Sequence, residues 1–394
     1  MKPSQRKPPR TAMPNFEPTL QAAHARLAAV QPSAYARTRN ALDGAVTRLS
    51  PYLTHGLLSL REVFDAVNAR HPLDAQHKLV FELGWRAYYR HVWAHVGDGI
   101  HASIHTGLLP DEAYQPEMPA DVLEARTGIP AIDQAVRELY ETGYVHNHAR
   151  MWLASYIVHL RKVHWHAGAQ WMLGHLLDGD VASNHLSWQW VAGTSSTKPY
   201  LFNADNVAKY APAQWHSPGT VIDTSYEELD RIARSSAQLR PYYRSTLEGM
   251  QLPSVFTAPP QAAWSAPDSA VVKDRDVWLA HPWSLGAVPD RFKTDGLVIG
   301  VALAEIHAET PWSAHRWEFV TQGLQAQTAH LWWGGSAQIT QVLGTARNVS
   351  WQPDPHMHAA VLGAQELPPK PLFQAVELYC PSFAQWWRRT KIAD

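Results

Sequence analysis

Two stretches of the chain, HNHARMWLASY at 146–156 and LLDGDVASNHLSWQWVAGTSS at 176–196, decide its fold. The first stretch places Arg150 on an otherwise apolar helix, where a buried guanidinium needs a carboxylate or a polar cofactor as its partner. The second stretch places two close carboxylates, Asp178 and Asp180, ahead of an asparagine and a Trp-x-Trp pair. On their own these carboxylates could cap a helix or form a weak metal pair. The missing third ligand and the aromatic neighbours argue against a metal, so we expect no metal site.

Helical patterning surrounds both stretches, from residue 16 to about residue 210. Segments 60–67 (LREVFDAV) and 131–140 (AIDQAVRELY) carry apolar residues at the i, i+3, i+4 and i+7 positions of amphipathic surface helices. Segments 79–96 and 150–163 are apolar on more than one side, which is typical of central helices. The core of a helical domain should therefore lie between these last two segments.

A third stretch, TRLSPYLTHGLLS at 47–59, places hydroxyl side chains next to the start of a predicted helix. Backbone N–H groups at such a start, together with Ser and Thr side chains, suit a pyrophosphate. A plain helix cap is the alternative interpretation of the same residues.

The pattern changes after about residue 246, where a proline-rich segment predicts an extended linker over 246–271. Short apolar runs then alternate with helix-like stretches, which predicts a mainly parallel α/β sheet. The expected strands are DVWLAHP (276–282), LVIGVALAE (297–305), AHLWWGG (329–335), VSWQPDP (349–355) and AVELYCP (375–381), and the expected helices are 316–327 and 336–346.

Composition limits the class of protein. A hydrophobic fraction of 45% and a charged fraction of 18% exclude disorder as the main state. The net charge of −1 gives no general attraction to polyanions, so any affinity for nucleic acid must come from a local basic face. The single cysteine, Cys380, excludes an intrachain disulfide and a cysteine-rich zinc cluster, and it favours a reducing cytoplasm. Residues 1–15 are basic and proline-rich without an apolar signal region, and we expect a flexible arm there.

Together these segments resemble the FAD-binding domain of DNA photolyases and cryptochromes, over most of residues 16–215. The resemblance implies an α-helical photolyase-type FAD-binding domain at 16–245, followed after the linker by a small α/β (Rossmann-like) domain at 272–394. Photolyases normally begin with an α/β antenna domain, and three C-terminal segments resemble parts of it: 276–286, 312–327 and 380–389. We therefore expect a shortened antenna domain relocated to the C-terminus, and the sequence leaves open whether it holds a second chromophore.

The resemblance also implies a set of residues that hold FAD. Asn184 matches the residue that faces flavin N5, and an asparagine at this position favours a repair enzyme over a cryptochrome. Val46 stands where the family motif has threonine, which removes one phosphate hydrogen bond. The implied cofactor-binding residues are Tyr35, Thr47, Leu49, Ser50, Arg86, Asn147, Arg150, Asp178, Asp180 and Asn184.

Photoreduction in this family runs along a row of tryptophans from the flavin to the surface. Trp188 matches the first member of that row and Trp165 the middle one. The aligned position of the outer member falls near Glu112, so either Tyr114 or another of the 18 tryptophans would complete the path.

A further set of residues matches the lesion pocket of cyclobutane dimer photolyases. Two departures, His148 for arginine and Ala87 for glutamate, leave the lesion less well defined than the flavin site. A flipped-out lesion would stack on aromatic faces, while the acid of Glu82 would hydrogen-bond the pyrimidine. The implied substrate-binding residues are Glu82, Trp85, Asn147, Met151 and Trp190, and the implied catalytic residues are Glu82, Trp165, Trp188 and Asn184.

The function implied by the resemblance is that of a deoxyribodipyrimidine photo-lyase, in which an electron from excited reduced flavin splits cyclobutane pyrimidine dimers. A cryptochrome-like blue-light sensor without repair activity is the alternative, and a flavoprotein with another substrate is a third. We expect damaged DNA as the partner, a monomeric protein, a cytoplasmic location and no membrane span.

Overall fold

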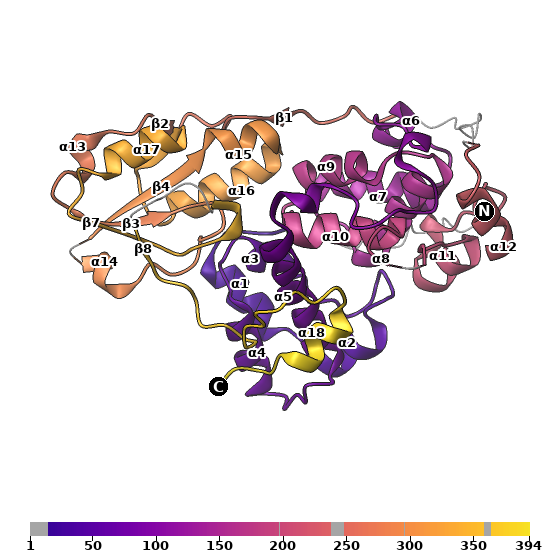
Figure 1. Cartoon of the computed structure of the whole chain (residues 1–394), viewed down its shortest axis with the longest axis horizontal. Helices are drawn as coiled ribbons and strands as arrows, with labels where there is room; N and C mark the ends of the chain where they lie inside the picture. Colours follow the sequence, from indigo (N-terminus) through magenta and orange to yellow (C-terminus); the bar gives the residue numbers. More distant parts are fainter. Residues whose placement is uncertain (1–14, 197, 238–247, 295, 358–363) are drawn as a thin grey trace, which may run out of the picture.

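The computed structural model describes residues 15–196, 198–237, 248–294, 296–357 and 364–394. Residues 1–14, most of the expected arm, lie outside this range. The described chain is helical up to residue 233, and a parallel sheet with helices follows from residue 264 (Figure 1). None of the helices described here combines the length and apolarity needed to cross a membrane.

The helical part is organised around three helices: α5 (Lys78–Val96), α9 (Trp165–His175) and α10 (Val181–Ala192). α10 packs against both α9 and α5. Each of the three is buried on much of its circumference, as expected of central helices. The other α-helices of this part are α1 (Leu20–Ala28), α2 (Pro32–Thr38), α3 (Ser50–Thr54), α4 (Leu60–Asn68), α6 (Ala120–Leu123), α7 (Pro130–Thr142), α8 (Asn147–Ser155), α11 (Ala204–Tyr210) and α12 (Tyr226–Ala233).

The helices expected at 60–67, 79–96 and 131–140 are confirmed as α4, α5 and α7. A capping box fixes the start of α4, since the Ser59 and Glu62 side chains each bond the other's backbone N–H. The segment 150–163 differs from a single helix: α8 continues into one π-helical turn, η3 (Tyr156–Leu160), and ends before Lys162, whose φ is +53°. Such turns redirect side chains within a helix.

The C-terminal sheet has the strand order β2-β6-β4-β3-β7-β8, and every neighbouring pair is parallel. The expectation of a mainly parallel sheet is confirmed. Residues Val277 to Ala280 of β3 are all buried, because β3 lies inside the sheet with both faces covered. The strands are β2 (Trp264–Ser265), β3 (Asp276–Ala280), β4 (Leu297–Leu303), β6 (Leu331–Gly334), β7 (Asn348–Trp351) and β8 (Gln365–Glu366).

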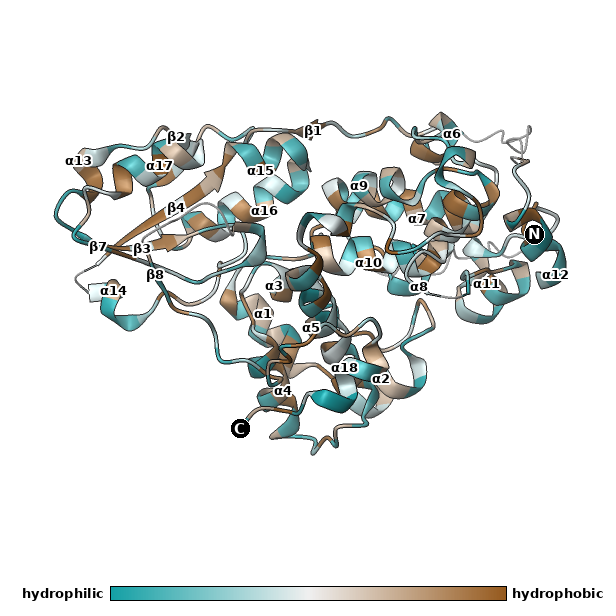
Figure 2. Ribbon diagram, in the orientation of Figure 1, coloured by the Kyte–Doolittle hydropathy of each residue, from teal (hydrophilic) through white to brown (hydrophobic). Residues whose placement is uncertain are grey.

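Five helices accompany this sheet, and Figure 2 shows the strongly hydrophobic strands β3 and β4 lying among them. The helices are α13 (Ser269–Val272), α14 (Asp290–Thr294), α15 (Ala304–Glu309), α16 (Ala314–Gln325) and α17 (Ser336–Leu343).

The expected linker takes part in pairing. β2 adds an edge strand to the parallel sheet, and β1 (Val255–Phe256) pairs antiparallel with β5 (Trp312–Ser313). The tryptophan of β2, Trp264, donates a hydrogen bond to Oγ1 of Thr321 at 3.1 Å. Strand pairing at Phe256 and Trp264 therefore holds this segment in place, although its prolines predict an extended linker.

The strand expected at 375–381 is wrong. The position beside β7 is taken by β8, and Leu378 in the expected strand is 68% exposed. The backbone of this segment bonds to side chains of α5 instead: Tyr88 Oη donates to the carbonyl of Cys380 at 3.2 Å, and the Cys380 N–H donates to Nε2 of His91 at 3.1 Å.

The helix that follows, α18 (Phe383–Arg389), packs on α5 (Figure 1). Gly84 makes this close approach possible, because a Cβ at this position would overlap the ring of Trp387. The chain thus returns from the sheet to the helical part before it ends.

The sheet also contacts the helical part directly. The ring of His55, which is fully buried, lies between two carbonyl oxygens, with Nδ1 2.5 Å from Pro282 and Nε2 2.7 Å from Leu177. The buried Arg316 of α16 donates to the carbonyl of Leu173 at 2.8 Å and to that of Gly179. These contacts form one continuous boundary between the two parts.

Candidate functional site

A cavity of about 220 Å³ lies among α3, α5, α8, α9 and α10. Eight of the residues expected to serve a flavin site line it: Ser50, Arg86, Asn147, Arg150, Met151, Asp178, Asn184 and Trp188. The other lining residues are Tyr144, Val145, Ala154, Met172, Leu176, Ser183, Ser187 and Val191. The structure therefore brings residues from four separate sequence stretches to one cavity.

Arg150 and Asp178 form an ion pair on this wall. Nη2 of Arg150 lies 2.9 Å and 2.8 Å from the two carboxylate oxygens, and Nε donates to the carbonyl of Val145 at 2.7 Å. The guanidinium also lies over the ring of Tyr144, 5.5 Å from its centroid. These contacts hold the Arg150 side chain in one orientation beside the cavity.

Arg86 of α5 is the cation of the cavity that lacks a carboxylate partner. It donates from Nη2 to Oγ1 of Thr54 at 2.9 Å, and within the described ranges no ion pair joins it to an acid. Burial lowers the pKa of Arg86, and Asp180 opposes that shift. An unpaired cation on a cavity wall favours an anionic ligand, so the wall formed by Arg86 and Ser50 fits a diphosphate.

One face of α10 supplies the side chains on the opposite wall. Asn184 Nδ2 donates to the carbonyl of Ala169 at 2.8 Å, which leaves the side-chain oxygen of Asn184 available to the cavity. Ser183, Ser187 and Val191 share this wall and were not identified from the sequence. Ser187 and Val191 lie three and seven residues after Asn184, on the same face of the helix, and this spacing is the signal that could have found them.

Trp188, also on α10, is buried at 2% exposure and lines the cavity. Gly168 of α9 admits its ring, since a Cβ there would overlap the indole. Trp165 at the start of α9 is also 2% exposed, lies off the cavity, and donates from Nε1 to Oγ of Ser103 at 3.0 Å.

A chain of aromatic rings leads outward from Trp165. The ring of His164 lies 5.7 Å from that of Trp165, and the ring of Tyr114 lies 6.3 Å from that of His164. Tyr114 is partly exposed, so the series reaches from a buried tryptophan toward solvent.

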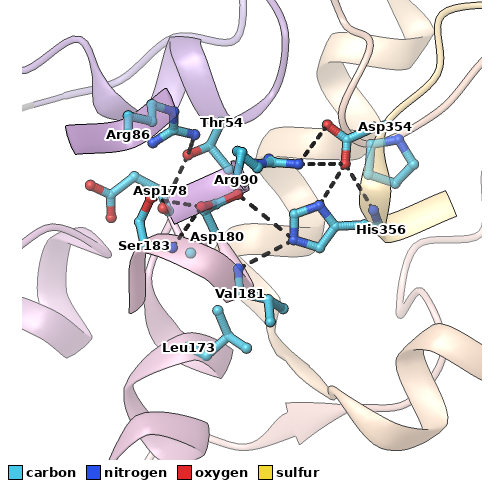
Figure 3. A network of polar contacts seen from close by, with 12 residues as sticks. Thr54, Arg86, Arg90, Leu173, Asp178, Asp180, Val181, Ser183, Asp354 and His356 are labelled. Carbon is cyan, nitrogen blue, oxygen red and sulfur yellow. Dashed lines mark hydrogen bonds and ion pairs between the residues drawn. The ribbon is translucent and has the colours of Figure 1, made fainter. Parts of the chain in front are cut away.

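Asp180 is not among the residues that line the cavity, and it belongs instead to a network of polar contacts (Figure 3). It is the N-cap of α10 and accepts from the backbone N–H and the hydroxyl of Ser183 at 2.9 Å and 2.7 Å. It also forms an ion pair with Arg90, which contacts Asp354 at 3.3 Å. Nδ1 of His356 lies 2.6 Å from Asp354, so the network joins α10 and α5 to the loop after β7.

Glu82 also lies outside the residues that line the cavity. Its carboxylate forms an ion pair with Arg39 at 3.2 Å, and its side chain is 38% exposed. Burial raises the pKa of Glu82, while Arg39 and Lys78 lower it. Burial and the neighbouring Glu82 raise the pKa of Tyr35, which is likewise not among the residues that line the cavity.

Trp85 and Trp190, the two expected stacking residues, are in different surroundings. The Trp85 ring stacks on Phe383 of α18 with centroids 4.1 Å apart. Trp190 is 38% exposed, and its ring lies 5.8 Å from that of Tyr200. One face of the Trp85 ring is therefore covered by α18, whereas the ring of Trp190 is accessible.

The remaining two expected cofactor residues lie at the start of α3. Leu49 is its N-cap residue and is 2% exposed, so its side chain belongs to the core. Oγ1 of Thr47 accepts from the Leu49 N–H at 3.4 Å. Arg48 between them adopts a left-handed conformation with φ of +51°, which bends the chain sharply just before Ser50 enters the cavity wall.

The sequence is similar to known proteins over part of its length. Residues 79–244 match the sequence profile of the FAD binding domain of DNA photolyase. A deoxyribodipyrimidine photo-lyase of Synechococcus sp. is 34% identical over 179 residues, which cover 42% of this chain and 37% of that protein. A cryptochrome DASH of Gloeobacter violaceus is 34% identical over 170 residues, covering 41% of this chain and 34% of that protein. The crystal structure of a Synechocystis sp. cryptochrome aligns at 29% identity with a TM-score of 0.45, covering 50% and 44% of the two chains.

This chain spans less than half the length of the curated relatives that it matches. The matched residues 79–244 carry α5, α8, α9 and α10, which form most of the cavity wall. Residues 79–244 of this chain are thus similar to the FAD-binding domain of the photolyase and cryptochrome family.

Proposed function

We propose that this chain binds FAD in the cavity and repairs cyclobutane pyrimidine dimers in DNA under blue light, as a deoxyribodipyrimidine photo-lyase. The observation that carries the proposal is the cavity itself. It is lined by Arg86, which forms no ion pair, by the oriented side chain of Asn184 and by the buried Trp188. When bound, FAD supplies the chromophore and the electron that the reaction needs.

The residues of the chain would divide the work of holding FAD. Arg86 and Ser50 would take the diphosphate, since they offer a hydroxyl and a cation that forms no ion pair with a carboxylate. Arg150, fixed by Asp178, and the side-chain oxygen of Asn184 orient the flavin ring through hydrogen bonds. Tyr35, Thr47, Leu49 and Asp180 would act from outside the cavity wall, by shaping the segments that carry the contacting residues.

Electron supply would begin at Trp188, which lies on the cavity wall, and continue through Trp165. The ring series Trp165, His164 and Tyr114 supports Tyr114 as the outer end of the path, in place of the missing third tryptophan. His164 would bridge them as a packed aromatic ring.

The lesion would enter from the side of Asn147 and Met151, which line the cavity, with Trp190 accessible for stacking. Glu82 would hydrogen-bond the pyrimidine from its position beside Arg39. Stacking of the lesion on Trp85 requires Phe383 to move aside, because that ring occupies one face of Trp85.

A blue-light sensor that does not repair DNA is the second candidate, and the covered face of Trp85 favours it. A protein that never accepts a lesion can keep this ring permanently packed against α18. In either case we propose a monomeric, cytoplasmic protein, with damaged DNA as the partner of the repair enzyme.

We further propose that residues 272–394 descend from a shortened, relocated antenna domain of the Rossmann-like class, joined to a flavin domain at 16–245 by the linker 246–271. Counted from β3, the order β6-β4-β3-β7-β8 reads 3-2-1-4-5, the order of a doubly wound sheet. β2 extends that sheet at one edge.

Reconstitution with FAD tests the cofactor proposal. The purified protein should retain or take up FAD, and Arg86→Ala should weaken FAD binding about 10- to 100-fold through the loss of a charge-assisted contact. Arg137→Ala removes a partly exposed arginine outside the cavity and should bind FAD as the wild type does. A wild-type protein that takes up no FAD would refute the proposal.

Repair is tested separately, with a dimer-containing oligonucleotide incubated with the FAD-loaded protein under blue light. Recovery of intact pyrimidines supports the photo-lyase. Photoreduction without any recovery supports the light sensor.

A further inference from the structure

Three histidines from separate elements meet on the far side of α10 from the flavin cavity. His101 ends the 3-10 helix η1 (Gly97–His101), His166 lies in the first turn of α9, and His185 lies in α10. One ring nitrogen from each lies within 4.8 Å of the other two. In the part of the chain that the structure describes, no other group of three histidine, cysteine or acidic side chains meets this condition.

The rings face one another nearly edge to face. Ring centroids of His101 and His185 lie 5.0 Å apart, those of His166 and His185 5.6 Å apart, and those of His101 and His166 5.7 Å apart. Three protonated imidazoles repel one another when no acid lies between them, so this packing is unfavourable for charged rings. Neutral imidazoles each offer a lone pair, and one shared cation can bind all three.

His185 supplies the second and independent observation. Its side chain is fully buried, and neither Nδ1 nor Nε2 makes a hydrogen bond of normal geometry, although the carbonyl of Val181 lies near the ring. Buried polar groups in proteins are paired in the great majority of cases, because an unpaired one loses its hydration without compensation. The carbonyl of Val181 can satisfy one ring nitrogen at most, so the other nitrogen of His185 points to a missing ligand of the imidazole.

We propose that His101, His166 and His185 bind a divalent transition-metal ion of the Zn²⁺ class. Three imidazoles are a familiar ligand set for Zn²⁺, with Zn–N distances of about 2.0–2.1 Å, and tetrahedral geometry then places the nitrogens about 3.3 Å apart. The cluster has to contract by roughly 1.5 Å at its widest to reach this arrangement. His101 is exposed and ends a short 3-10 helix, so it can make most of this adjustment.

The metal would keep an open coordination position. His101 and His166 line a second cavity of about 340 Å³, and Asp98 and Gln170 also line it. A water molecule or an anionic ligand from this cavity can complete the tetrahedron, and the same opening admits the ion. Gln170 Nε2 lies 3.3 Å from Nε2 of His166, so this amide rotates away if that nitrogen is the ligand.

Metal binding is measured on the full chain, purified without a histidine tag and freed of metal with a chelator. Zn²⁺ titration by calorimetry, with metal analysis of the dialysed protein, should give one ion per chain. His101→Ala changes an exposed residue that the fold tolerates, and it should weaken binding about tenfold or more. His166→Ala should do the same. The matched control is His105→Ala, an exposed histidine four residues away and outside the cluster, which should bind as the wild type does.

X-ray absorption at the zinc edge should show three imidazole nitrogens at about 2.0–2.1 Å and one further light ligand. A wild-type protein that binds no Zn²⁺ overturns the proposal. So does wild-type affinity in both His101→Ala and His166→Ala, since the ion would then lie elsewhere. Zn²⁺ binding without FAD uptake would leave the metal site standing and reject the photo-lyase, so the two proposals fail separately.

Discussion

The rings of Trp85 and Phe383 stack with centroids 4.1 Å apart and planes inclined by 11°. Trp85 is the side chain that the family resemblance assigns to lesion stacking, and Phe383 belongs to the helix α18 near the end of the sequence. The contact makes α18 a competitor for any base that enters on this side of α5.

Phe383→Leu tests this competition. Loss of the aromatic contact should free the Trp85 face and tighten binding of a dimer-containing oligonucleotide by a factor of about 2–10, which corresponds to the typical worth of an aromatic pair. Fluorescence anisotropy measures the affinity. Phe373→Leu is the control, because Phe373 packs on Trp386 and Trp387 in the same cluster. Unchanged or weaker binding by Phe383→Leu would show that Trp85 takes no part in recognition.

Glu82→Ala tests the substrate contact. The repair rate should fall by about one to two powers of ten while the FAD content is retained, since a hydrogen bond worth about 1–3 kcal/mol is lost from the reacting pyrimidine. Breaking the exposed ion pair with Arg39 should cost at most about 1 kcal/mol of unfolding free energy. Asp65→Asn, which breaks the exposed Arg61–Asp65 pair, serves as the control. Loss of FAD and of stability together would instead assign Glu82 a structural role.

Trp188→Phe should abolish most flavin photoreduction, because it removes the electron donor that lines the cavity. Tyr114→Phe should slow it while leaving FAD bound, if Tyr114 completes the path. Absorbance under blue light with an external thiol measures both rates. Trp171→Phe, a partly buried tryptophan of α9 that contacts Tyr140 and His175, is the control. Wild-type rates in Trp188→Phe would remove the proposed path, and wild-type rates in Tyr114→Phe would remove its outer end.

Acid stability should depend on Asp354. Although burial alone would raise it, the pKa of Asp354 is held well below its usual range by Arg90 and His356. A carboxylate with a depressed pKa stabilises the folded state above its unfolded pKa of about 4, and this contribution is lost as the pH falls further. Asp354→Asn should therefore lower the free energy of unfolding at pH 7 by about 1–3 kcal/mol and flatten its decline below pH 4.

Urea denaturation at pH 7, 5, 4 and 3 measures this effect. Asp290→Asn removes an exposed aspartate that pairs with Lys293, and it should change the pH profile far less, because solvent screens that pair. Equal slopes in Asp354→Asn and the wild type below pH 4 would show that other carboxylates govern acid unfolding.

Periodic patterns predicted much of this structure. The 3.6-residue repeat located α4 and α7, a segment that is apolar on more than one side located α5, and the alternation of short apolar runs with helical stretches predicted the parallel sheet. The same logic was wrong at 375–381, where Leu378 and Tyr379 are exposed and the backbone of Cys380 contacts α5. Periodicity describes which residues are buried, and it does not describe what buries them.

The candidate site shows the same limit. Arg150 was found because a cation on an apolar helix needs a partner, whereas Asp178 was identified as a cofactor residue through the family resemblance, and the structure pairs the two. The grouping of His101, His166 and His185 depends on how η1, α9 and α10 cross in space, and no spacing in the sequence encodes that crossing. Phe383 likewise stacks on Trp85 only because the chain returns to α5 after the sheet.

The hydrogen bond from Tyr88 to the carbonyl of Cys380 joins residues 292 positions apart. During synthesis on the ribosome, α5 emerges long before its partners Phe383 and Trp387 exist, and its aromatic face stays uncovered throughout that interval. Contacts this distant in sequence slow folding and expose apolar surface to aggregation. The helical part therefore completes this packing only after α18 has been synthesised. The yield of folded protein in the cell should depend on chaperones that cover α5 until then.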